Sequence, residues 1–92
     1  MSMVVMVLES VPVSVRGELT RWFLEVHAGV FVGSPSALVR DKLWDKVRHS
    51  AKQGGCILLH NDDSEQGFAI RTWGPTRRAI EDYDGLKLVR RA

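Results

Sequence analysis

The sequence is poor in the residues with which small proteins form covalent or metal cross-links. It contains one cysteine, Cys56, among 92 residues, which excludes an intramolecular disulfide and a cysteine-based zinc cluster. The three histidines, His27, His49 and His60, show no spacing typical of a metal site. Domains of this size often gain stability from a disulfide, a metal or a partner subunit. We therefore expect a homo-oligomer.

Long apolar runs are also missing. The apolar start, residues 1–8, is interrupted at Glu9 and is too short to cross a bilayer. It lacks the basic segment that opens a signal peptide, so we expect a cytoplasmic protein with no membrane partner. With 45% apolar residues, residues 1–92 predict a single compact domain.

Two helices and two strands are predicted in the first half of the chain. Residues 3–8 are rich in β-branched side chains, which is typical of a strand covered on both faces. Ser14 is the expected cap of a first helix that Gly29 ends. A short strand follows at residues 30–32, and Ser34 is the expected cap of a second helix. The apolar side chains that predict the two helices are Leu19, Trp22, Phe23 and Val26 in the first, and Val39, Leu43, Val47 and Ala51 in the second.

The second half of the chain predicts strands. Residues 56–60 and 68–73 are apolar or alternating segments that flank a polar turn. The last apolar patch consists of Leu86, Leu88 and Val89 and predicts a terminal strand that pairs with a sheet edge of its own subunit or of a partner. The order β-α-β-α-β-β plus a terminal strand indicates an α+β fold with the helices on one face of a sheet.

Short motifs spread over almost the whole chain, at unshifted spacing, resemble one known family. They are Glu9, Val11-Pro12, Arg16-Gly17, Trp22, Leu24-Glu25-Val26, residues 28–33, Trp44, Gly67-Phe68, Arg77-Arg78 and residues 84–89. Together they resemble the CRISPR-associated protein 2 family in its subtype I-E form.

The resemblance implies a ferredoxin-like sheet with helices packed on one face, a symmetric homodimer, and a C-terminal strand at the dimer or partner interface. It also implies a function. Such a dimer bridges two dimers of the CRISPR-associated protein 1 integrase and supports the double-stranded DNA protospacer during spacer integration in antiviral defence. This scaffold role requires no cofactor and no catalysis by the chain itself.

Three arginines are the candidate DNA-binding residues, namely Arg16, Arg77 and Arg78. On composition alone a solvated surface charge explains Arg77 and Arg78 as well as DNA contact does, and it is the better explanation of Arg16. Their match to the basic positions of the family favours contact with the DNA backbone. Subtype I-E relatives carry a further basic residue where this chain has Ser14, which implies a weaker contact in that loop. The resemblance assigns the partner interface to Leu86, Leu88 and Val89, and leaves Arg90 and Arg91 without a role.

Two other functions stay open at this point. In the wider family an acidic residue at the position of Glu9 is associated with a divalent metal, and Mg²⁺ suits carboxylate ligands. Glu9 is therefore a candidate metal ligand and catalytic residue of an independent endonuclease that acts on DNA or RNA, although the sequence alone favours a surface glutamate or a salt bridge to a partner. An RNA-binding module is disfavoured because the predicted strands lack the paired aromatic residues that stack on bases.

Overall fold

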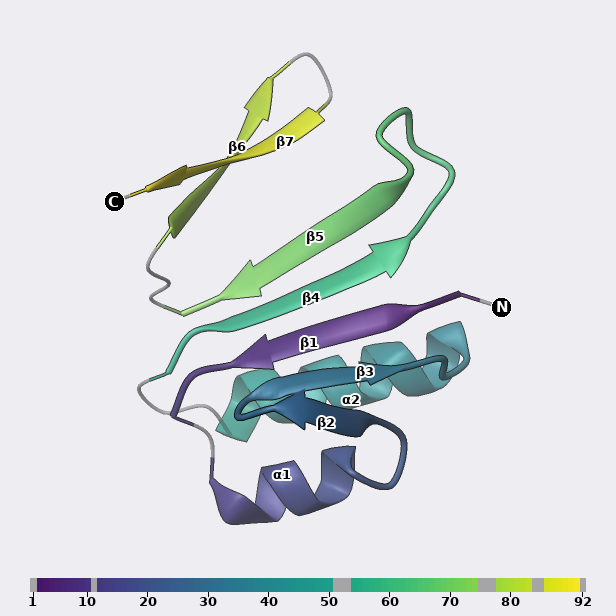
Figure 1. Cartoon of the computed structure of the whole chain (residues 1–92), viewed down its shortest axis with the longest axis vertical. Coiled ribbons are helices and arrows are strands. Elements are labelled where there is room, and N and C mark those ends of the chain that lie inside the picture. Colours follow the sequence, from purple (N-terminus) through teal and green to yellow (C-terminus); the bar gives the residue numbers. More distant parts are fainter. Residues whose placement is uncertain (1, 11, 51–53, 75–77, 84–85, 92) are drawn as a thin grey trace.

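The computed structural model describes residues 2–10, 12–50, 54–74, 78–83 and 86–91, the last two segments by their backbone alone. Seven strands and two helices follow one another along these segments (Figure 1). They are β1 (Val4–Leu8), α1 (Val13–Leu19), β2 (Leu24–His27), β3 (Val30–Gly33), α2 (Ala37–Ser50), β4 (Cys56–Asn61), β5 (Phe68–Trp73), β6 (Arg78–Tyr83) and β7 (Leu86–Arg91).

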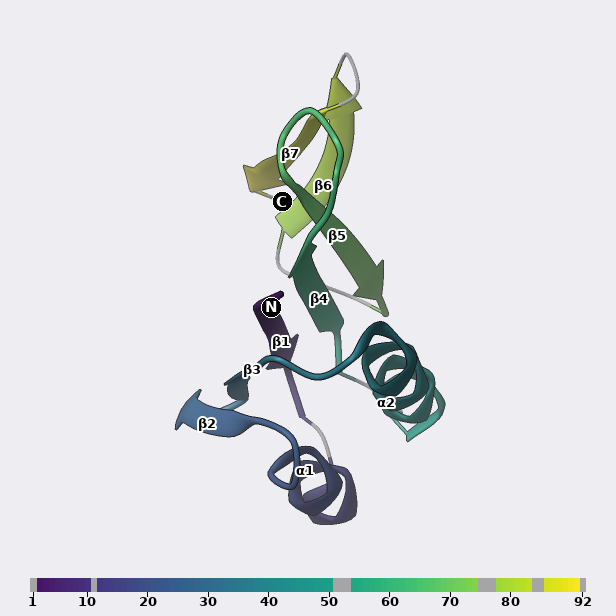
Figure 2. The ribbon, with the colours of Figure 1, turned by 90° about the vertical axis from the view of Figure 1, so that its right-hand side faces the viewer.

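Five strands form one antiparallel sheet in the order β2-β3-β1-β4-β5. Both helices lie on the same side of this sheet (Figure 2). The elements β1 to β4 therefore have the βαββαβ order and the strand arrangement of a ferredoxin-like fold, and β5 extends the sheet beyond β4. The predicted α+β class, with helices on one face, is confirmed.

The core lies between the sheet and the helices. Along β1 the side chains alternate between fully buried and half-buried, because successive residues of a strand point to opposite faces. The buried set faces the helices and, with residues of α1, α2, β3 and β4, forms one cluster. Its members are Val4, Met6, Leu8, Val15, Leu19, Phe23, Phe31, Leu43, Trp44, Val47, Cys56 and Leu58. Each large apolar side chain buried in this way stabilises the fold by roughly 1.5–3 kcal/mol.

The opposite face of the sheet is open and apolar. Residues paired directly across antiparallel strands lie on the same face, so the registers define a row across all five strands: Leu24, Val32, Val5, Leu59 and Ile70. A second row contains His27, Val30, Val7, Ile57 and Thr72. Neither row contains a lysine, arginine, aspartate or glutamate, and every member is half-buried or exposed. We call these two rows the open face.

The first helix is shorter than predicted. It ends at Leu19 instead of Gly29, and its N-cap residue is Pro12, with no side-chain cap from Ser14. Residues 24–27 form β2, which pairs with β3 through a hairpin whose turn contains Gly29 at a φ of 79°. Pairing with β3 prevails over the helical spacing, because a positive φ at glycine allows the tight turn that a hairpin needs. Trp22, predicted as a core or interface anchor, is consequently 49% exposed.

The second helix begins two residues later than its expected cap implies. Ser36, instead of Ser34, precedes the first helical residue, and its hydroxyl oxygen accepts a hydrogen bond from the Val39 backbone N–H at 3.3 Å. This bond satisfies one of the free N–H groups at the start of the helix. The predicted apolar spacing is confirmed, because Leu43 and Val47 are buried. Trp44 is buried as well.

The C-terminal segment differs from the prediction of one terminal strand. It contains two strands, β6 and β7, which form a separate antiparallel sheet in which Ile80 pairs with Val89. Strand β6 was missed because its sequence mixes charged and apolar side chains. The apolar patch at Leu86, Leu88 and Val89 lies in β7, as predicted, but β7 pairs with its own β6 and not with an edge of the larger sheet. The hairpin lies beyond β5 (Figure 1).

Candidate nucleic-acid interface

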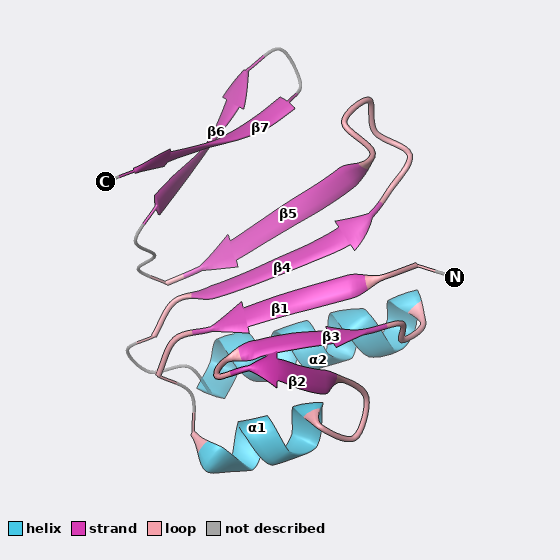
Figure 3. Cartoon of the chain, in the orientation of Figure 1, coloured by secondary structure: helices cyan, strands magenta, loops and turns pink. Residues whose placement is uncertain are grey.

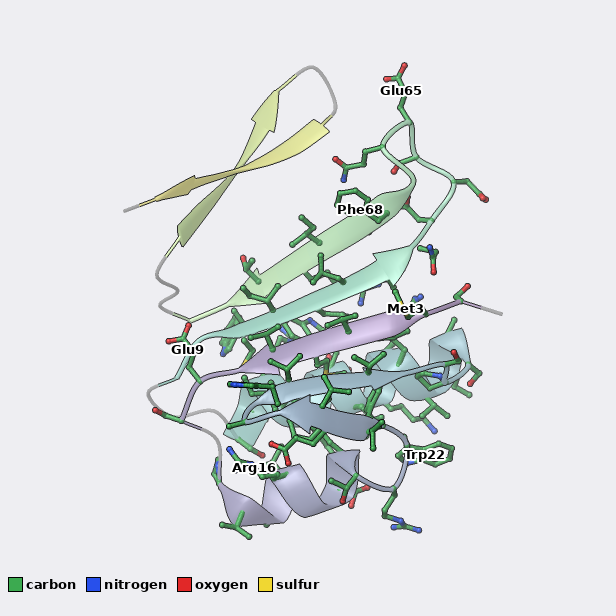
Figure 4. The ribbon with its side chains drawn as sticks, in the orientation of Figure 1. Met3, Glu9, Arg16, Trp22, Glu65 and Phe68 are labelled. Carbon is green, nitrogen blue, oxygen red and sulfur yellow. The ribbon has the colours of Figure 1, made fainter. Side chains whose placement is uncertain are left out.

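Three of the predicted site residues, Glu9, Arg16 and Arg78, lie toward one end of the sheet (Figure 3 and Figure 4). Leu8 pairs with Cys56, which in turn pairs with Trp73, so β1 and β5 end where β4 begins. The start of α1, the end of α2 and the start of β6 lie toward the same end (Figure 3). We call this the Glu9 end, because Glu9 directly follows β1 there. Arg16 lies in α1, and Figure 4 shows it on this side of the molecule, as it does Glu9.

Glu9 is held by its backbone at the edge of the open face. Its N–H donates to the Gly55 carbonyl oxygen at 2.9 Å, which continues the pairing of β1 with β4 by one residue. Along β1, Val5 and Val7 belong to the open face, and the next residue in this alternation is Glu9. The chain then turns sharply at Ser10, which has a φ of 54°. The half-buried carboxylate therefore marks the point where the open face ends.

The described residues of one chain do not fit a magnesium site at Glu9. Mg²⁺ needs close to octahedral oxygen ligation, usually from one or two carboxylates together with water and substrate. No group of three or more histidine, cysteine, aspartate or glutamate side chains in the described part of the chain is placed to hold a metal ion. Nearby, burial and then the charge of Glu9 raise the pKa of the Cys56 thiol. A buried thiol of this kind behaves as a small core residue.

Arg16 is a half-buried cation that pairs with one carboxylate among the described residues. Its Nε lies 3.7 Å from Glu25 Oε2, and 41% of its side chain is exposed. The same oxygen of Glu25 accepts a hydrogen bond from the Gly29 N–H at 3.0 Å. Arg16 Nε is buried and makes no hydrogen bond among the described residues. Because the buried Nε cannot reach DNA, only the terminal nitrogens of the guanidinium are left for another anionic partner.

The helix around Arg16 adds nothing to phosphate binding. A first helix that is capped by Ser14 and continues to Gly29, as the sequence predicts, places Arg16 near its start, where free N–H groups favour an anion. In the structure α1 has seven residues and Arg16 is in its last turn, where the free carbonyl groups favour a cation instead. This expectation is wrong, and the charge of Arg16 itself is the attraction for a phosphate.

The remaining candidates lie in the C-terminal segment. Arg77 is outside the described residues. Arg78 opens β6, and its backbone pairs with that of Arg91 at the end of β7. The roles of these arginines, and of Leu86, Leu88 and Val89 in β7, stay predictions of the sequence.

Sequence reasoning missed Arg48, a basic residue that contacts Trp73 on the helical side of the Glu9 end. The guanidinium of Arg48, in the last turn of α2, lies over the Trp73 ring at 5.4 Å from its centroid. It also donates to the Asp45 carboxylate one turn earlier. A signal was present in the sequence, because Arg40, Trp44 and Arg48 recur at four-residue spacing on one side of α2.

A second cluster of charges joins α2 to β5 nearer the other end of the sheet. Asp41 Oδ1 accepts hydrogen bonds from Arg40 Nε and from Arg71 Nη1, both at 3.0 Å. Arg40 Nη1 also lies 3.2 Å from Nδ1 of the buried His60. The hydrogen bond from Arg40 is the main reason that the pKa of Asp41 falls below its ordinary value, with a smaller contribution from Arg71 against an opposing effect of burial. These contacts are fully explained as links between the helix and the sheet.

None of the helices in the described residues is long and apolar enough to span a membrane.

Comparison with known protein families identifies the family of this chain. The family model described as CRISPR-associated protein (Cas_Cas2CT1978) matches residues 3–88, which include every strand and helix from β1 to β6. The chain therefore belongs to this CRISPR-associated Cas2 family, which implies a role in CRISPR adaptation.

Proposed function

We propose that the chain is the homodimeric scaffold of a subtype I-E CRISPR adaptation complex. Its dimer bridges two dimers of the CRISPR-associated protein 1 integrase and binds the protospacer duplex through the DNA backbone. The observation that carries this proposal is the open face, which extends across all five strands and contains no lysine, arginine, aspartate or glutamate. Membership of the Cas2 family supports the adaptation role.

The open face supports a second copy of the chain as its occupant. A two-fold dimer brings the same surface of both subunits together, and an uncharged patch is compatible with itself because no like charges meet. Leu24 and Val26 on the edge strand are exposed by 69% and 56%, so the apolar surface extends to the rim. Burial of a contiguous patch of this kind is the usual source of dimer stability.

The three candidate arginines support the DNA-binding role. Two-fold symmetry doubles each contact, so Arg16, Arg77 and Arg78 supply six guanidinium groups per dimer. Contacts to phosphates position a duplex without reading its bases, which suits a protein that must accept arbitrary protospacers. Exchange of all three arginines for glutamate abolishes spacer capture in cells while the dimer stays folded. Undiminished spacer acquisition by this triple variant contradicts the DNA-binding role.

An independent Mg²⁺-dependent endonuclease is the alternative, and the position of Glu9 is the observation in its favour. Because Glu9 ends the open face, a dimer formed through that face brings a second Glu9 toward the first when its axis passes near this end. Cleavage of DNA or RNA that stops with a chelator and with Glu9→Ala supports the endonuclease. A Glu9→Ala protein that still acquires spacers indicates that the scaffold role does not need this carboxylate.

The decisive experiment is co-elution with the integrase of the same host. The two proteins are mixed with and without a duplex protospacer and separated by size exclusion with light scattering. A mass equal to two integrase dimers and one dimer of this chain supports the scaffold function. A chain that elutes alone as a dimer and cleaves nucleic acid in Mg²⁺ contradicts it and favours the endonuclease.

A further inference from the structure

Arg48 is a cation whose orientation is fixed by neighbours on two sides. The Trp73 ring lies under its guanidinium at 5.4 Å, and the Asp45 carboxylate accepts from Nη2. One third of the side chain, 33%, stays exposed. Its Nε is buried without a hydrogen-bond partner in the described part of the chain, and Nη1 has no partner there either. The buried Nε cannot reach a partner outside the chain, so the guanidinium is held in place with Nη1 left to donate.

The location of Arg48 connects it with the candidate DNA contacts. It is in the last turn of α2, and Trp73 is the last residue of β5. Trp73 pairs with Cys56, which pairs with Leu8, the residue before Glu9. The chain runs from Trp73 to Arg77 and Arg78 within five residues. Arg48 therefore belongs to the Glu9 end, on the side of the sheet that the helices cover (Figure 3).

We propose that Arg48 is a further contact for the DNA backbone, in which its guanidinium donates to a phosphate at the helical side of the Glu9 end. The proposal rests on the DNA-binding function proposed above and extends the basic surface beyond Arg16, Arg77 and Arg78. A planar guanidinium suits a phosphate because it presents several donors in a fixed fork. Stacking on Trp73 reduces the ordering cost of binding, since the side chain is already oriented.

Two features of the site oppose the binding of a phosphate, and both are weak. The pair with Asp45 is a surface contact within one helix, with 60% of the Asp45 side chain exposed, and pairs of this kind contribute little. The carbonyl groups at the end of α2 repel an anion, but this effect is screened by salt and is limited to the last turn. A charge-assisted bond between guanidinium and phosphate is stronger than either.

The test is the salt dependence of duplex binding by the full-length chain. Fluorescence anisotropy with a labelled DNA duplex of arbitrary sequence gives the slope of log affinity against log salt concentration. One phosphate contact contributes about 0.9 to this slope, so Arg48→Gln, which removes two contacts from a dimer, lowers its magnitude by about 2. Affinity at moderate salt falls roughly tenfold or more. Circular dichroism verifies that the variant is folded.

Two matched variants separate the possible outcomes. Arg21→Gln makes the same change at an exposed arginine just after α1, next to Trp22 at the opposite end (Figure 4), and leaves the slope unchanged. Arg16→Gln tests the proposed function itself and lowers the slope. If Arg16→Gln lowers the slope and Arg48→Gln does not, the inference about Arg48 is wrong while the proposed function stands.

A loss of affinity without a change of slope also overturns the inference, since Arg48 would then only hold Trp73 and the end of β5. If neither Arg16→Gln nor Arg48→Gln changes the slope, or the wild-type chain binds no duplex, both the inference and the proposed DNA-binding role are wrong.

Discussion

The backbone of Gly54 lies directly against the carbonyl oxygen of Glu9. A Cβ atom at residue 54 would stand 1.5 Å from that oxygen, far inside the contact distance of any two atoms. The neighbouring Gly55 accepts the hydrogen bond from the Glu9 N–H. Strand β1, which precedes α1, and the start of β4, which follows α2, are therefore in close backbone contact at the Glu9 end. This contact determines where Glu9 and the start of α1 lie.

The first prediction concerns this contact. Gly54→Ala forces the backbones of residues 9 and 54 apart, because neither contacting group is a flexible side chain. The cost of such an overpacked change is about 1–3 kcal/mol or more in the free energy of unfolding. Chemical denaturation measures it. Gly17→Ala is the control, because no atom lies within 4 Å of a Cβ there and the residue is inside α1. It stabilises the chain by about 0.5–1 kcal/mol. A Gly54→Ala protein as stable as the wild type contradicts the close contact.

The second prediction concerns the competition between Glu25 and DNA for Arg16. Glu25→Gln removes the negative charge 3.7 Å from Arg16 Nε, while its amide oxygen can still accept from the Gly29 N–H. Binding of a duplex tightens by roughly two- to fivefold, as expected for the loss of a weak, partly exposed ion pair. Fluorescence anisotropy measures the dissociation constant.

Glu18→Gln is the matched control for Glu25→Gln. Glu18 lies in α1, pairs with Lys46 at 3.1 Å, and is 34% exposed against 24% for Glu25. Both variants change the net charge equally, so a general electrostatic effect acts on both. Equal tightening by the two variants shows that Glu25 does not compete specifically for Arg16.

The third prediction is the pH dependence that Asp41 gives to stability. The pKa of Asp41 lies below its ordinary value of 3.8, so the folded state favours the ionised carboxylate. This stabilisation is fully present above the ordinary pKa and is lost as the pH falls through the lower pKa of the folded state. Asp41→Asn therefore destabilises the chain at pH 7, by no more than about 1 kcal/mol for a half-exposed group. In acid, below the pKa of Asp41 in the folded state, this difference between the variant and the wild type disappears.

Urea unfolding at pH 7 and in acid measures this difference in stability. Asp63→Asn is the control, because Asp63 lies in the exposed turn between β4 and β5. It changes the stability little at either pH. A difference between Asp41→Asn and the wild type that persists unchanged in acid contradicts the role of the ionised carboxylate.

Much of the fold follows from local patterns in the sequence. The β-branched run at residues 3–8 predicts β1, although not that one of its faces stays open, and the apolar spacing of Leu43 and Val47 in α2 predicts their burial correctly. The boundary between α1 and β2 does not follow from such patterns. Phe23 is buried and Val26 exposed, yet their spacing suits a helix equally well. The pairing of residues 24–27 with β3 decides that they form a strand instead of a helix. A contact between two separate segments cannot be predicted from the residue spacing within one of them.

The candidate site shows the same division. Arg16 and Glu9 were identifiable by their resemblance to family positions, and the structure places both toward one end of the sheet. The partner of Arg16, Glu25, was not identifiable, because the predicted long helix gave no reason for residue 25 to return toward residue 16. Arg48 was missed for a related reason. Its contact with Trp73 joins residues 25 positions apart, and only the packing of α2 against β5 brings them together.

The last prediction tests the open face as the dimer interface. Leu59→Glu introduces a charge in the middle of the row that crosses the five strands, and Leu24→Glu introduces one at its rim. Burial of an unpaired charge costs about 2 kcal/mol or more, so the dimer dissociation constant rises by roughly 30-fold or more. Sedimentation equilibrium measures this constant, and circular dichroism verifies folding.

Leu38→Glu is a closely matched control for Leu24→Glu. Leu38 is 66% exposed and Leu24 is 69% exposed, but Leu38 lies in α2, on the side of the sheet away from the open face. The same substitution is therefore made at equal exposure on opposite sides of the molecule. If the dimer forms through the open face, only Leu24→Glu weakens it. If Leu38→Glu is the variant that dissociates the dimer, the two subunits meet through their helices, and Glu9 and its symmetry mate then lie on outer surfaces instead of at the joint.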